Sequence, residues 1–192
     1  STQQHFTYGE INNTRIYCGV IIDNTYLYMG TDNGILIYNY RTDRYEQPAT
    51  DFPTDVRTMA LQGDTLWIGA LNGLYTYQLQ NRKLSPLDTK RNGLPHNTIY
   101  SIIRTGDNQI YVGTYNGLCR NIASNGKFEK IPLPVNSSQS NLFVNSLLED
   151  TGRQCIWIGT EGYLFQYFPS TGQMKQTEAF HNNSIKSLAL DG

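Results

Sequence analysis

A short signature recurs four times along the chain, and its spacing limits the possible folds more than any other feature. Each copy places an aromatic residue two positions before a glycine, and a polar turn with a second glycine follows. The pairs are Tyr28 with Gly30, Trp67 with Gly69, Tyr111 with Gly113, and Trp157 with Gly159. Successive glycines of these pairs are 39, 44 and 46 residues apart. A repeat of this length is typical of propellers and related arrays.

The second repeat shows which elements one unit contains. Val56–Leu61 and Leu74–Leu79 alternate with period two, and Leu66–Gly69 is continuously apolar, as in a strand buried on both faces. Asn72-Gly73 predicts a tight type I′ hairpin turn with positive φ at both residues. A short strand near Lys83–Leu87 completes four antiparallel strands, which make one propeller blade.

The other repeats follow the same order, and no stretch carries a helical period. Their expected strands are Tyr17–Ile22, Tyr26–Gly30, Ile35–Tyr40 and one starting at Tyr45, then Ile99–Arg104, Gln109–Gly113, Leu118–Ile122 and Lys127–Ile131, then Val144–Glu149, Cys155–Gly159, Leu164–Phe168 and Gln173–Thr177. Ser184–Leu190 opens a fifth repeat, and His5–Ile11 is interpreted as the outer strand of an earlier blade. We therefore predict an all-β, incomplete β-propeller cut from a larger one, with blades at 12–50, 51–90, 91–135 and 136–180 and partial blades at 1–11 and 181–192.

Composition excludes several functional classes. The chain of 192 residues is 16% charged with a net charge of −1, which argues against a nucleic-acid partner because phosphate binding needs a basic surface. It contains no run of 18 apolar residues, so we expect no membrane contact by this segment. No metal-ligand cluster, phosphate loop or cofactor motif is present. Cys18, Cys119 and Cys155 are interpreted as small buried strand residues, with a Cys119–Cys155 disulfide left open.

The repeats resemble the two-component regulator propeller repeat. Gly93–Ile99 fits the opening of that pattern, Val144–Asp150 fits its inner strand, and Ile156–Thr160 fits its second strand. The sequence departs from the pattern in having Tyr28 and Tyr111 where the family has Trp. The resemblance covers about four repeats, which is nearly the whole chain.

The resemblance implies a function that the residues alone do not give. Proteins with such repeats are typically the periplasmic sensor regions of hybrid two-component histidine kinases, and their propellers respond to a glycan-derived signal. The expected partners are an oligosaccharide ligand and the remainder of the parent sensor protein. The chain itself has no kinase motif and is expected not to be an enzyme. The alternatives are a lyase-like propeller enzyme and a protein–protein interaction scaffold.

One end of every blade is the expected ligand side. It carries the connections between blades, which are Gln47–Asp55, Asp88–Asn97, Pro132–Phe143 and Glu178–Asn183, and also the turns between second and third strands. We call this end the loop face. Sugar binding needs planar aromatics beside directional polar groups, and Tyr115 with Asn116 offers both. The candidate ligand residues on the loop face are Lys90, Arg91, Asn92, His96, Tyr115, Asn116, Asn141 and Glu161.

No catalytic residue is assigned. His5, His96 and His181 are scattered, and none has the spacing of a triad with an acid and a nucleophile. A lyase-like enzyme would need a histidine and an acid converging near the central channel, and only His96 is suitably placed for this role.

The repeated tryptophans and the two end blades carry the remaining predictions. Trp67 and Trp157 are interpreted as core residues, not as sugar-stacking platforms, and replacing either by Ala is expected to lower the free energy of unfolding by about 3–5 kcal/mol.

The end blades are expected to expose apolar faces, and the chain is therefore expected to self-associate. The residues expected on those faces are Val20, Ile22, Leu27, Leu147, Leu164 and Phe168.

Overall fold

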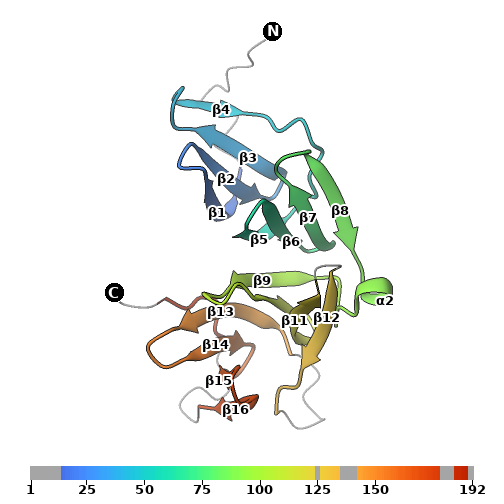
Figure 1. The fold of residues 1–192 in the computed structure, drawn as a ribbon, viewed down its shortest axis with the longest axis vertical. Coiled ribbons are helices and arrows are strands. Elements are labelled where there is room, and N and C mark those ends of the chain that lie inside the picture. The colour runs from blue at the N-terminus through green and yellow to red at the C-terminus, as the bar shows by residue number, and fades with distance from the viewer. Residues whose placement is uncertain (1–13, 124–125, 135–141, 178–183, 190–192) are drawn as a thin grey trace.

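The computed structural model describes residues 14–123, 126–134, 142–177 and 184–189, which form four antiparallel sheets of four strands (Figure 1). In every sheet the strands lie in sequence order. The blades comprise β1 (Ile16–Ile22), β2 (Tyr26–Thr31), β3 (Gly34–Asn39) and β4 (Arg44–Glu46); β5 (Val56–Gln62), β6 (Thr65–Ala70), β7 (Gly73–Gln78) and β8 (Lys83–Leu87); β9 (Ile99–Arg104), β10 (Ile110–Thr114), β11 (Gly117–Ala123) and β12 (Lys127–Ile131); β13 (Val144–Asp150), β14 (Cys155–Thr160), β15 (Leu164–Phe168) and β16 (Gln173–Gln176).

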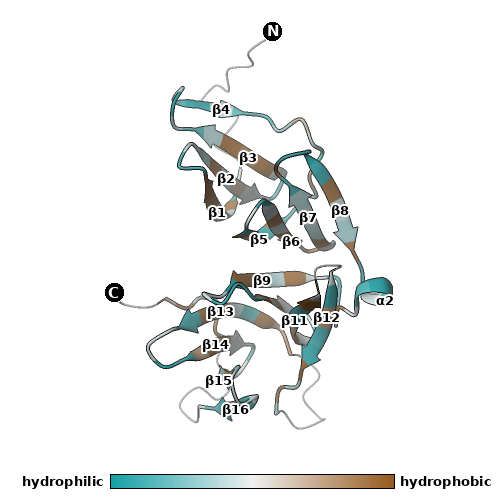
Figure 2. Cartoon of the chain, in the orientation of Figure 1, coloured by the Kyte–Doolittle hydropathy of each residue, from teal (hydrophilic) through white to brown (hydrophobic). Residues whose placement is uncertain are grey.

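The blades follow one another in an open arc (Figure 1). The first strand of each blade packs beside the first strand of the next, so β1, β5, β9 and β13 line the inner side of the arc. Figure 2 shows apolar stretches in the middle of many strands and hydrophilic residues over the outer strands β4 and β12. This arrangement is an incomplete β-propeller and confirms the predicted fold class.

Three clusters of buried apolar side chains hold the arc together, one at each junction between blades. Alternation along β6 directs Leu66 and Ile68 toward blade 1 and Trp67 toward blade 3. This is why the second strand of a blade has apolar residues at successive positions. Members of the three clusters include Ile22, Ile37, Val56, Leu66 and Ile68; Trp67, Leu74, Ile99, Ile102 and Val112; and Tyr111, Leu118, Val144, Leu147 and Ile158.

The repeated glycine sits where the next blade comes closest. A Cβ atom on Gly113 would lie 2.2 Å from Ser101 Oγ and 2.6 Å from Val144 Cγ1. Ser101 Oγ also donates a hydrogen bond across the junction to the Val144 carbonyl at 3.1 Å. Only a residue without a side chain allows this approach. The same contact joins Gly30 to Val56, Gly69 to Ile99, and Gly159 to Ile185.

The two tryptophans differ in burial. Trp67 is 5% exposed in the core between blades 2 and 3, and its ring meets Phe128 edge to face at 6.0 Å. Trp157 is only half-buried, so the prediction that it is a core residue was wrong for this chain. Trp157 and Gly159 share the sheet face that points away from blade 3. No further blade lies among the described residues to cover the indole.

The hairpins between second and third strands do not use the predicted type I′ turn. Gly73 pairs with Ala70 as the first residue of β7, and neither Asn72 nor Gly73 has a positive φ. In blades 1 and 3 the positive φ falls on the glycine that opens the third strand, with values of 111° at Gly34 and 103° at Gly117. In blade 4 it falls within the turn, with a value of 113° at Gly162. In blades 1 and 3 the glycine is therefore needed where the chain re-enters the third strand.

Two further expectations need correction. The connection predicted to be an irregular loop contains one helical turn, α2 (Thr89–Asn92), capped by the Asp88 side chain. The expected strand from Ser184 is reduced to a single bridge between Ser184 and Glu161. First strands elsewhere pair with the second strand of their own blade, and no such partner for Ser184–Ala189 lies in the described part of the chain. His5–Ile11 lies outside the described residues.

The end faces are built only in part from the predicted residues. Val20 and Ile22 pack between blades 1 and 2, and Leu147 packs between blades 3 and 4, because each points inward from its strand. Leu27 and Phe168 are half-buried on outward faces, and Leu164 is buried beside Gly159. The outward face of blade 1, which we call the blade 1 end face, is a row across all four strands: Ile21, Leu27, Tyr38 and Tyr45.

The cysteines are free thiols within the described residues. Cys119 lies in the core between blades 2 and 3, whereas Cys155 belongs to blade 4, so the disulfide left open by the sequence is not formed. Burial raises the pKa of Cys18 to about 11 and raises the pKa of Cys119 as well. Both thiols are therefore protonated and poorly reactive at neutral pH.

Candidate ligand-binding site

A β-bulge opens the first strand of every blade. The pairing register with the second strand shifts between Ile16 and Cys18, and the equivalent shift recurs in the other three blades. One residue in each blade is therefore left out of the pairing: Tyr17, Arg57, Tyr100 and Asn145. Bulges re-aim side chains and are frequent beside functional sites.

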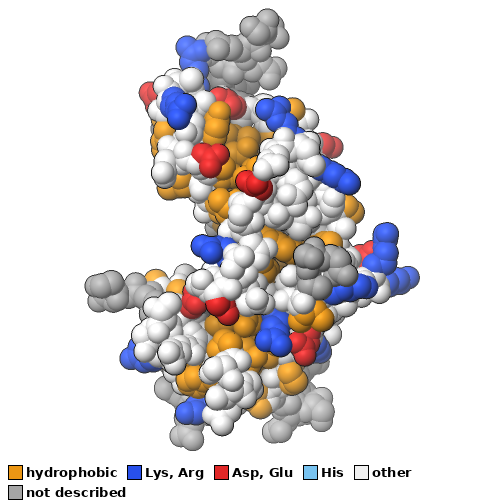
Figure 3. Space-filling view, viewed as in Figure 1, with side chains coloured by type: hydrophobic (Ala, Val, Ile, Leu, Met, Phe, Trp, Pro, Cys, Tyr) orange, Lys and Arg blue, Asp and Glu red, His pale blue; other side chains and the backbone are white. Residues whose placement is uncertain are grey.

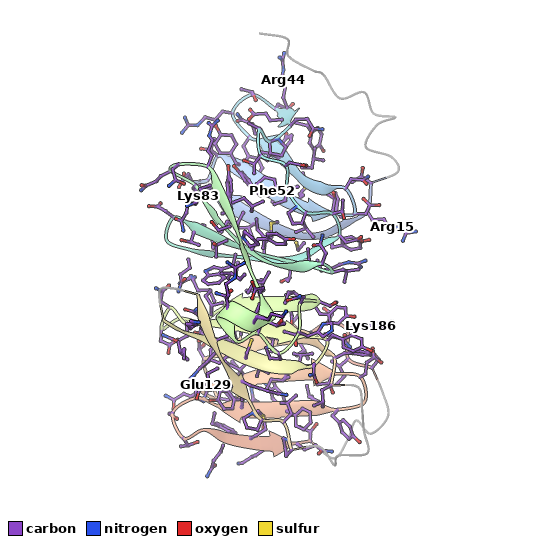
Figure 4. The ribbon with its side chains drawn as sticks, turned by 90° about the vertical axis from the view of Figure 1, so that its right-hand side faces the viewer. Arg15, Arg44, Phe52, Lys83, Glu129 and Lys186 are labelled. Atoms are coloured by element: carbon purple, nitrogen blue, oxygen red, sulfur yellow. The ribbon has the colours of Figure 1, made fainter. Side chains whose placement is uncertain are left out.

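These four residues, which we call the bulge row, lie at the loop-face end of the inner strands. Figure 4 shows Arg15, which precedes β1, and Lys186, which follows blade 4, on the same side of the molecule. Because inner strands of neighbouring blades are adjacent, the four side chains follow one another around the inner side of the arc. The fold thus places a polar or aromatic side chain at the same position of each repeat.

Arg57 is the cation of the bulge row. Its guanidinium lies over the Tyr17 ring at 3.9 Å from the centroid and pairs with Asp55 at 3.1 Å. Arg57 Nε is buried and has no hydrogen-bond partner in the described part of the chain. A buried donor without a partner is costly, so Arg57 has one hydrogen-bonding direction still available.

Tyr100 lies within the electrostatic influence of both neighbouring blades. Burial raises the pKa of its hydroxyl, the nearby Tyr115 and Glu161 raise it further, and Arg57 lowers it. Its ring is 6.0 Å from that of Phe143. Tyr100 thus stays a neutral hydroxyl donor and acceptor at physiological pH.

An aromatic cluster lies beside the bulge row. The His96 and Tyr115 rings are 4.9 Å apart between centroids, and Tyr115 and Phe143 are 4.1 Å apart. His96 Nδ1 accepts a hydrogen bond from the Thr98 amide at 3.0 Å. The Tyr115 amide donates to the Thr98 carbonyl at 3.0 Å. These bonds fix the two rings, while Tyr115 remains 39% exposed and accessible to a ligand.

The structure brings several predicted site residues together. The rings of His96 and Tyr115 are in contact, and the backbone amide of Asn116 donates a hydrogen bond to Thr114 Oγ1 at 3.0 Å. Glu161 accepts a hydrogen bond from Asn145 Nδ2 at 3.2 Å and another from Ser184 Oγ at 2.8 Å. An amide and a carboxylate therefore close the blade 4 end of the bulge row.

The remaining predicted residues lie elsewhere. Lys90, Arg91 and Asn92 belong to α2, which packs beside the outer strand β12 at the rim of the arc (Figure 1). Figure 3 shows Lys and Arg side chains gathered at this rim. Arg91 forms an ion pair with Asp88 at 3.0 Å, and the Asn92 side chain donates to the Gly126 carbonyl at 2.9 Å. Asn141 lies outside the described residues.

Sequence reasoning missed the bulge row. The signal was present, because Tyr17, Arg57, Tyr100 and Asn145 each follow the first apolar residue of their inner strand. In ordinary alternation that position shares a sheet face with the residue two positions later, as Tyr100 does with the buried Ile102, and nothing then marks it as part of a site. Only the bulge turns it toward the inner side of the arc.

The described residues contain no group of three or more His, Cys, Asp or Glu side chains able to hold a metal ion. No helix in the described part of the chain is long and apolar enough to cross a membrane.

Comparisons with known proteins find one matching repeat family and several propeller structures. The two component regulator propeller model matches residues 93–116. The whole chain is 90% identical, with a TM-score of 0.92, to the extracellular domain of BT4673 from B. thetaiotaomicron, described as a putative hybrid two component system and also as a putative one component system. The chain spans 26% of that structure.

More distant structures share the fold alone. The extracellular domain of the putative hybrid two component system BT3049 from B. thetaiotaomicron is 18% identical, with a TM-score of 0.74 over 91% of this chain and 24% of its own. A catalytically inactive virginiamycin B lyase from Staphylococcus aureus is 14% identical, with a TM-score of 0.65 over 91% of this chain and 58% of its own. No curated protein matches the chain. The chain therefore contains the two-component regulator propeller repeat that its sequence resembles.

Proposed function

We propose that this chain is part of the extracellular sensor region of a hybrid two-component system and that its loop face binds an oligosaccharide. The 90% identity to the extracellular domain from B. thetaiotaomicron over the whole chain supports the sensor role. In this proposal the signalling output belongs to the rest of the parent protein. The segment itself acts on the outside of the membrane and contributes recognition.

The observation that carries the ligand proposal is the juxtaposition of the aromatic cluster with the bulge row. The exposed Tyr115 ring offers an apolar plane for the C–H face of a sugar. The hydroxyl of Tyr100, the amide of Asn145 and the carboxylate of Glu161 offer directional hydrogen bonds nearby. Small-ligand sites combine such rings with a few convergent polar groups.

The arrangement favours binding over catalysis. His96 is held by the Thr98 amide and the Tyr115 ring, so its nearest partners are an N–H donor and an aromatic plane. A general base needs an orienting acid and a substrate proton within reach, and the contacts of His96 supply neither. The likeness to the virginiamycin B lyase concerns the fold.

Calorimetry on the purified chain with a panel of oligosaccharides tests the proposal. We expect binding that Tyr115→Ala and Asn145→Ala each weaken about tenfold, since each removes one main contact. Tyr40→Ala is the matched control, because Tyr40 is also an exposed tyrosine and lies on blade 1. Turnover of a sugar or lactone that His96→Ala abolishes would show an enzyme instead.

A further inference from the structure

Clefts between successive blades open on the face opposite the loop face. The cleft between blades 2 and 3 is lined by the first hairpin turn of blade 3 and by the second to fourth strands of blade 2. In the other two clefts different turns and strands of the two blades contribute. The cleft between blades 1 and 2 has a volume of about 300 Å³, and the other two have about 740 Å³ each. The larger volumes fall within the range of small-ligand sites, about 300–1,000 Å³.

The three clefts differ in charge. Asp23, Glu46 and Arg82 line the first, and Asp107, Arg120, Glu149 and Asp150 line the third. The described lining of the second cleft, between blades 2 and 3, has no acidic or basic side chain. Its polar lining is entirely amide and hydroxyl: Gln62, Thr65, Thr76, Gln78, Ser85, Asn108, Gln109 and Asn121.

Cross-strand pairing places these groups on one wall. Trp67, Thr76 and Ser85 are directly paired across β6, β7 and β8 and therefore share the face toward blade 3. The equivalent rows read Tyr28, Ile37 and Glu46 in blade 1, and Tyr111, Arg120 and Glu129 in blade 3. Blade 2 alone among the three has two neutral hydroxyls at these positions.

Part of the wall is fixed, and part is available. Gln62 accepts from Trp67 Nε1 at 3.0 Å and donates to the Asn108 carbonyl at 2.7 Å, which ties the two blades together. Thr65 and Gln78 bond to each other at 2.9 Å. The hydroxyls of Thr76 and Ser85 have no partner among the described residues, so they face the solvent of the cleft with their donors and acceptors unused.

Blade 3 supplies an apolar surface to the cleft. Ile122 is 56% exposed and lines the cleft together with the buried Ile110, whereas Leu87 lies on β8 in the same wall as Ser85. Isolated exposed apolar residues are common. Here, however, Ile122 lies across from a wall of hydroxyls and amides, and the two walls present the two kinds of surface that a sugar ring itself has.

We propose that the cleft between blades 2 and 3 binds a neutral oligosaccharide at a site separate from the loop face. Sugar hydroxyls donate and accept, as do the facing hydroxyls and amides, whereas an ionised ligand would find no counter-charge in the lining. The C–H face of the sugar packs against Ile122. The neighbouring charged clefts do not share this preference.

Titration calorimetry with neutral tetrasaccharides built from glucose, galactose, mannose or xylose, and with a tetragalacturonate, tests this proposal. The double variant Thr76→Val with Ser85→Ala removes both free hydroxyls and keeps the side-chain shapes. We expect it to bind the preferred neutral sugar about tenfold more weakly than the parent chain. Ser170→Ala removes an exposed hydroxyl from the third cleft and should leave the affinity unchanged.

The two proposed sites fail separately. Two independent sites predict two binding events per chain in the titration. The double variant should weaken one event and leave the other intact, and Tyr115→Ala should do the reverse. A single event that only the double variant weakens supports the cleft and overturns the loop-face site, and a single event that only Tyr115→Ala weakens overturns the cleft and supports the loop face. Preference for the tetragalacturonate, or absence of binding by every neutral sugar, also overturns the cleft proposal.

Discussion

At the scale of single residues, the next blade decides how much a repeated side chain contributes. Trp67 and Trp157 occupy the same position of their repeats, yet only Trp67 belongs to a cluster of buried apolar side chains. Trp157 retains a polar anchor, because its Nε1 donates to Asp150 Oδ2 at 3.1 Å. The same position of the repeat therefore contributes differently to the stability of different blades.

Replacing the two tryptophans tests this difference. Trp67→Ala should lower the free energy of unfolding by about 3–5 kcal/mol, the cost of removing a large buried aromatic side chain. Trp157→Ala should cost less, because its indole is already half in contact with water. Urea denaturation of both variants beside the parent chain measures the two losses. Equal losses would show that Trp157 is covered in solution, for example by a second copy.

Asp150 gives stability a defined dependence on pH. Hydrogen bonds from Trp157 Nε1 and the Arg153 amide, and the Arg153 guanidinium, hold the pKa of Asp150 below its usual value of 3.8. A lowered folded-state pKa stabilises the fold above the unfolded value, and this contribution is lost as the pH falls through the folded value. We expect Asp150→Asn to melt below the parent chain at pH 7.

Thermal melts of the parent chain and Asp150→Asn across a pH series check this expectation. The gap between their melting temperatures should be constant above about pH 5 and should close in strong acid, where the parent carboxylate is protonated. A gap that persists at the lowest pH would mean that packing, and not the charge, distinguishes the two side chains.

At the scale of elements, neighbouring blades are held together by the same set of contacts at each junction. Each junction combines a glycine with no room for a Cβ, an apolar residue of the next inner strand and, in blades 3 and 4, a serine that bonds across to the next chain segment. The contact at Gly159 and Ile185 follows the same pattern even though Ile185 lies in no regular strand. Junction chemistry is thus independent of whether a full blade follows.

Gly113→Ala probes a junction directly. The added methyl group meets Ser101 and both the side chain and the carbonyl of Val144, so the backbone of blade 4 must shift. We expect a loss of about 1–3 kcal/mol, as for overpacked cores. Gly152→Ala is the control, because its Cβ would meet only Asp150 Oδ1 at an ordinary 3.5 Å. Comparable stability of the two variants in denaturant would contradict the close approach.

At the scale of the whole molecule, the arc leaves two sheet faces without a neighbouring blade among the described residues. The blade 1 end face is apolar across all four strands and includes Ile21, which is 55% exposed. The corresponding row of blade 4 is Leu148, Trp157, Gln166 and Lys175, which is polar in its outer half. The two end faces therefore differ in polarity, and the blade 1 end face is the more apolar of the two.

We expect the chain to self-associate through the blade 1 end face. Contiguous exposed apolar surface of this kind favours association in water. Light scattering over a micromolar dilution series should show a mass above 21.8 kDa that falls on dilution. Ile21→Glu should restore a monomer, whereas Lys175→Glu, on the other end face, should not. A parent chain that is monomeric at every concentration would contradict the expectation.

The sequence by itself determined the blade. Period-two alternation, continuous apolar second strands and regularly spaced glycines specify local hydrogen bonding and burial, and nearly all expected strands agree with the observed ones within one or two residues. The His96 and Tyr115 pairing was also within reach, since both residues lie on loops that antiparallel strands bring to one end. The blade limits and the ligand residues remain predictions.

Only the tertiary structure decided what depends on the neighbouring blade. The bulge that turns Arg57 and Tyr100 inward, the half-exposure of Trp157 and the inward direction of Ile22 and Leu147 all follow from how successive sheets pack. The uncharged cleft lies between strands about 25–45 residues apart in sequence, so no local sequence pattern predicts it. Local sequence sets which residues share a strand face, but the partner that covers each face is chosen by contacts distant along the chain.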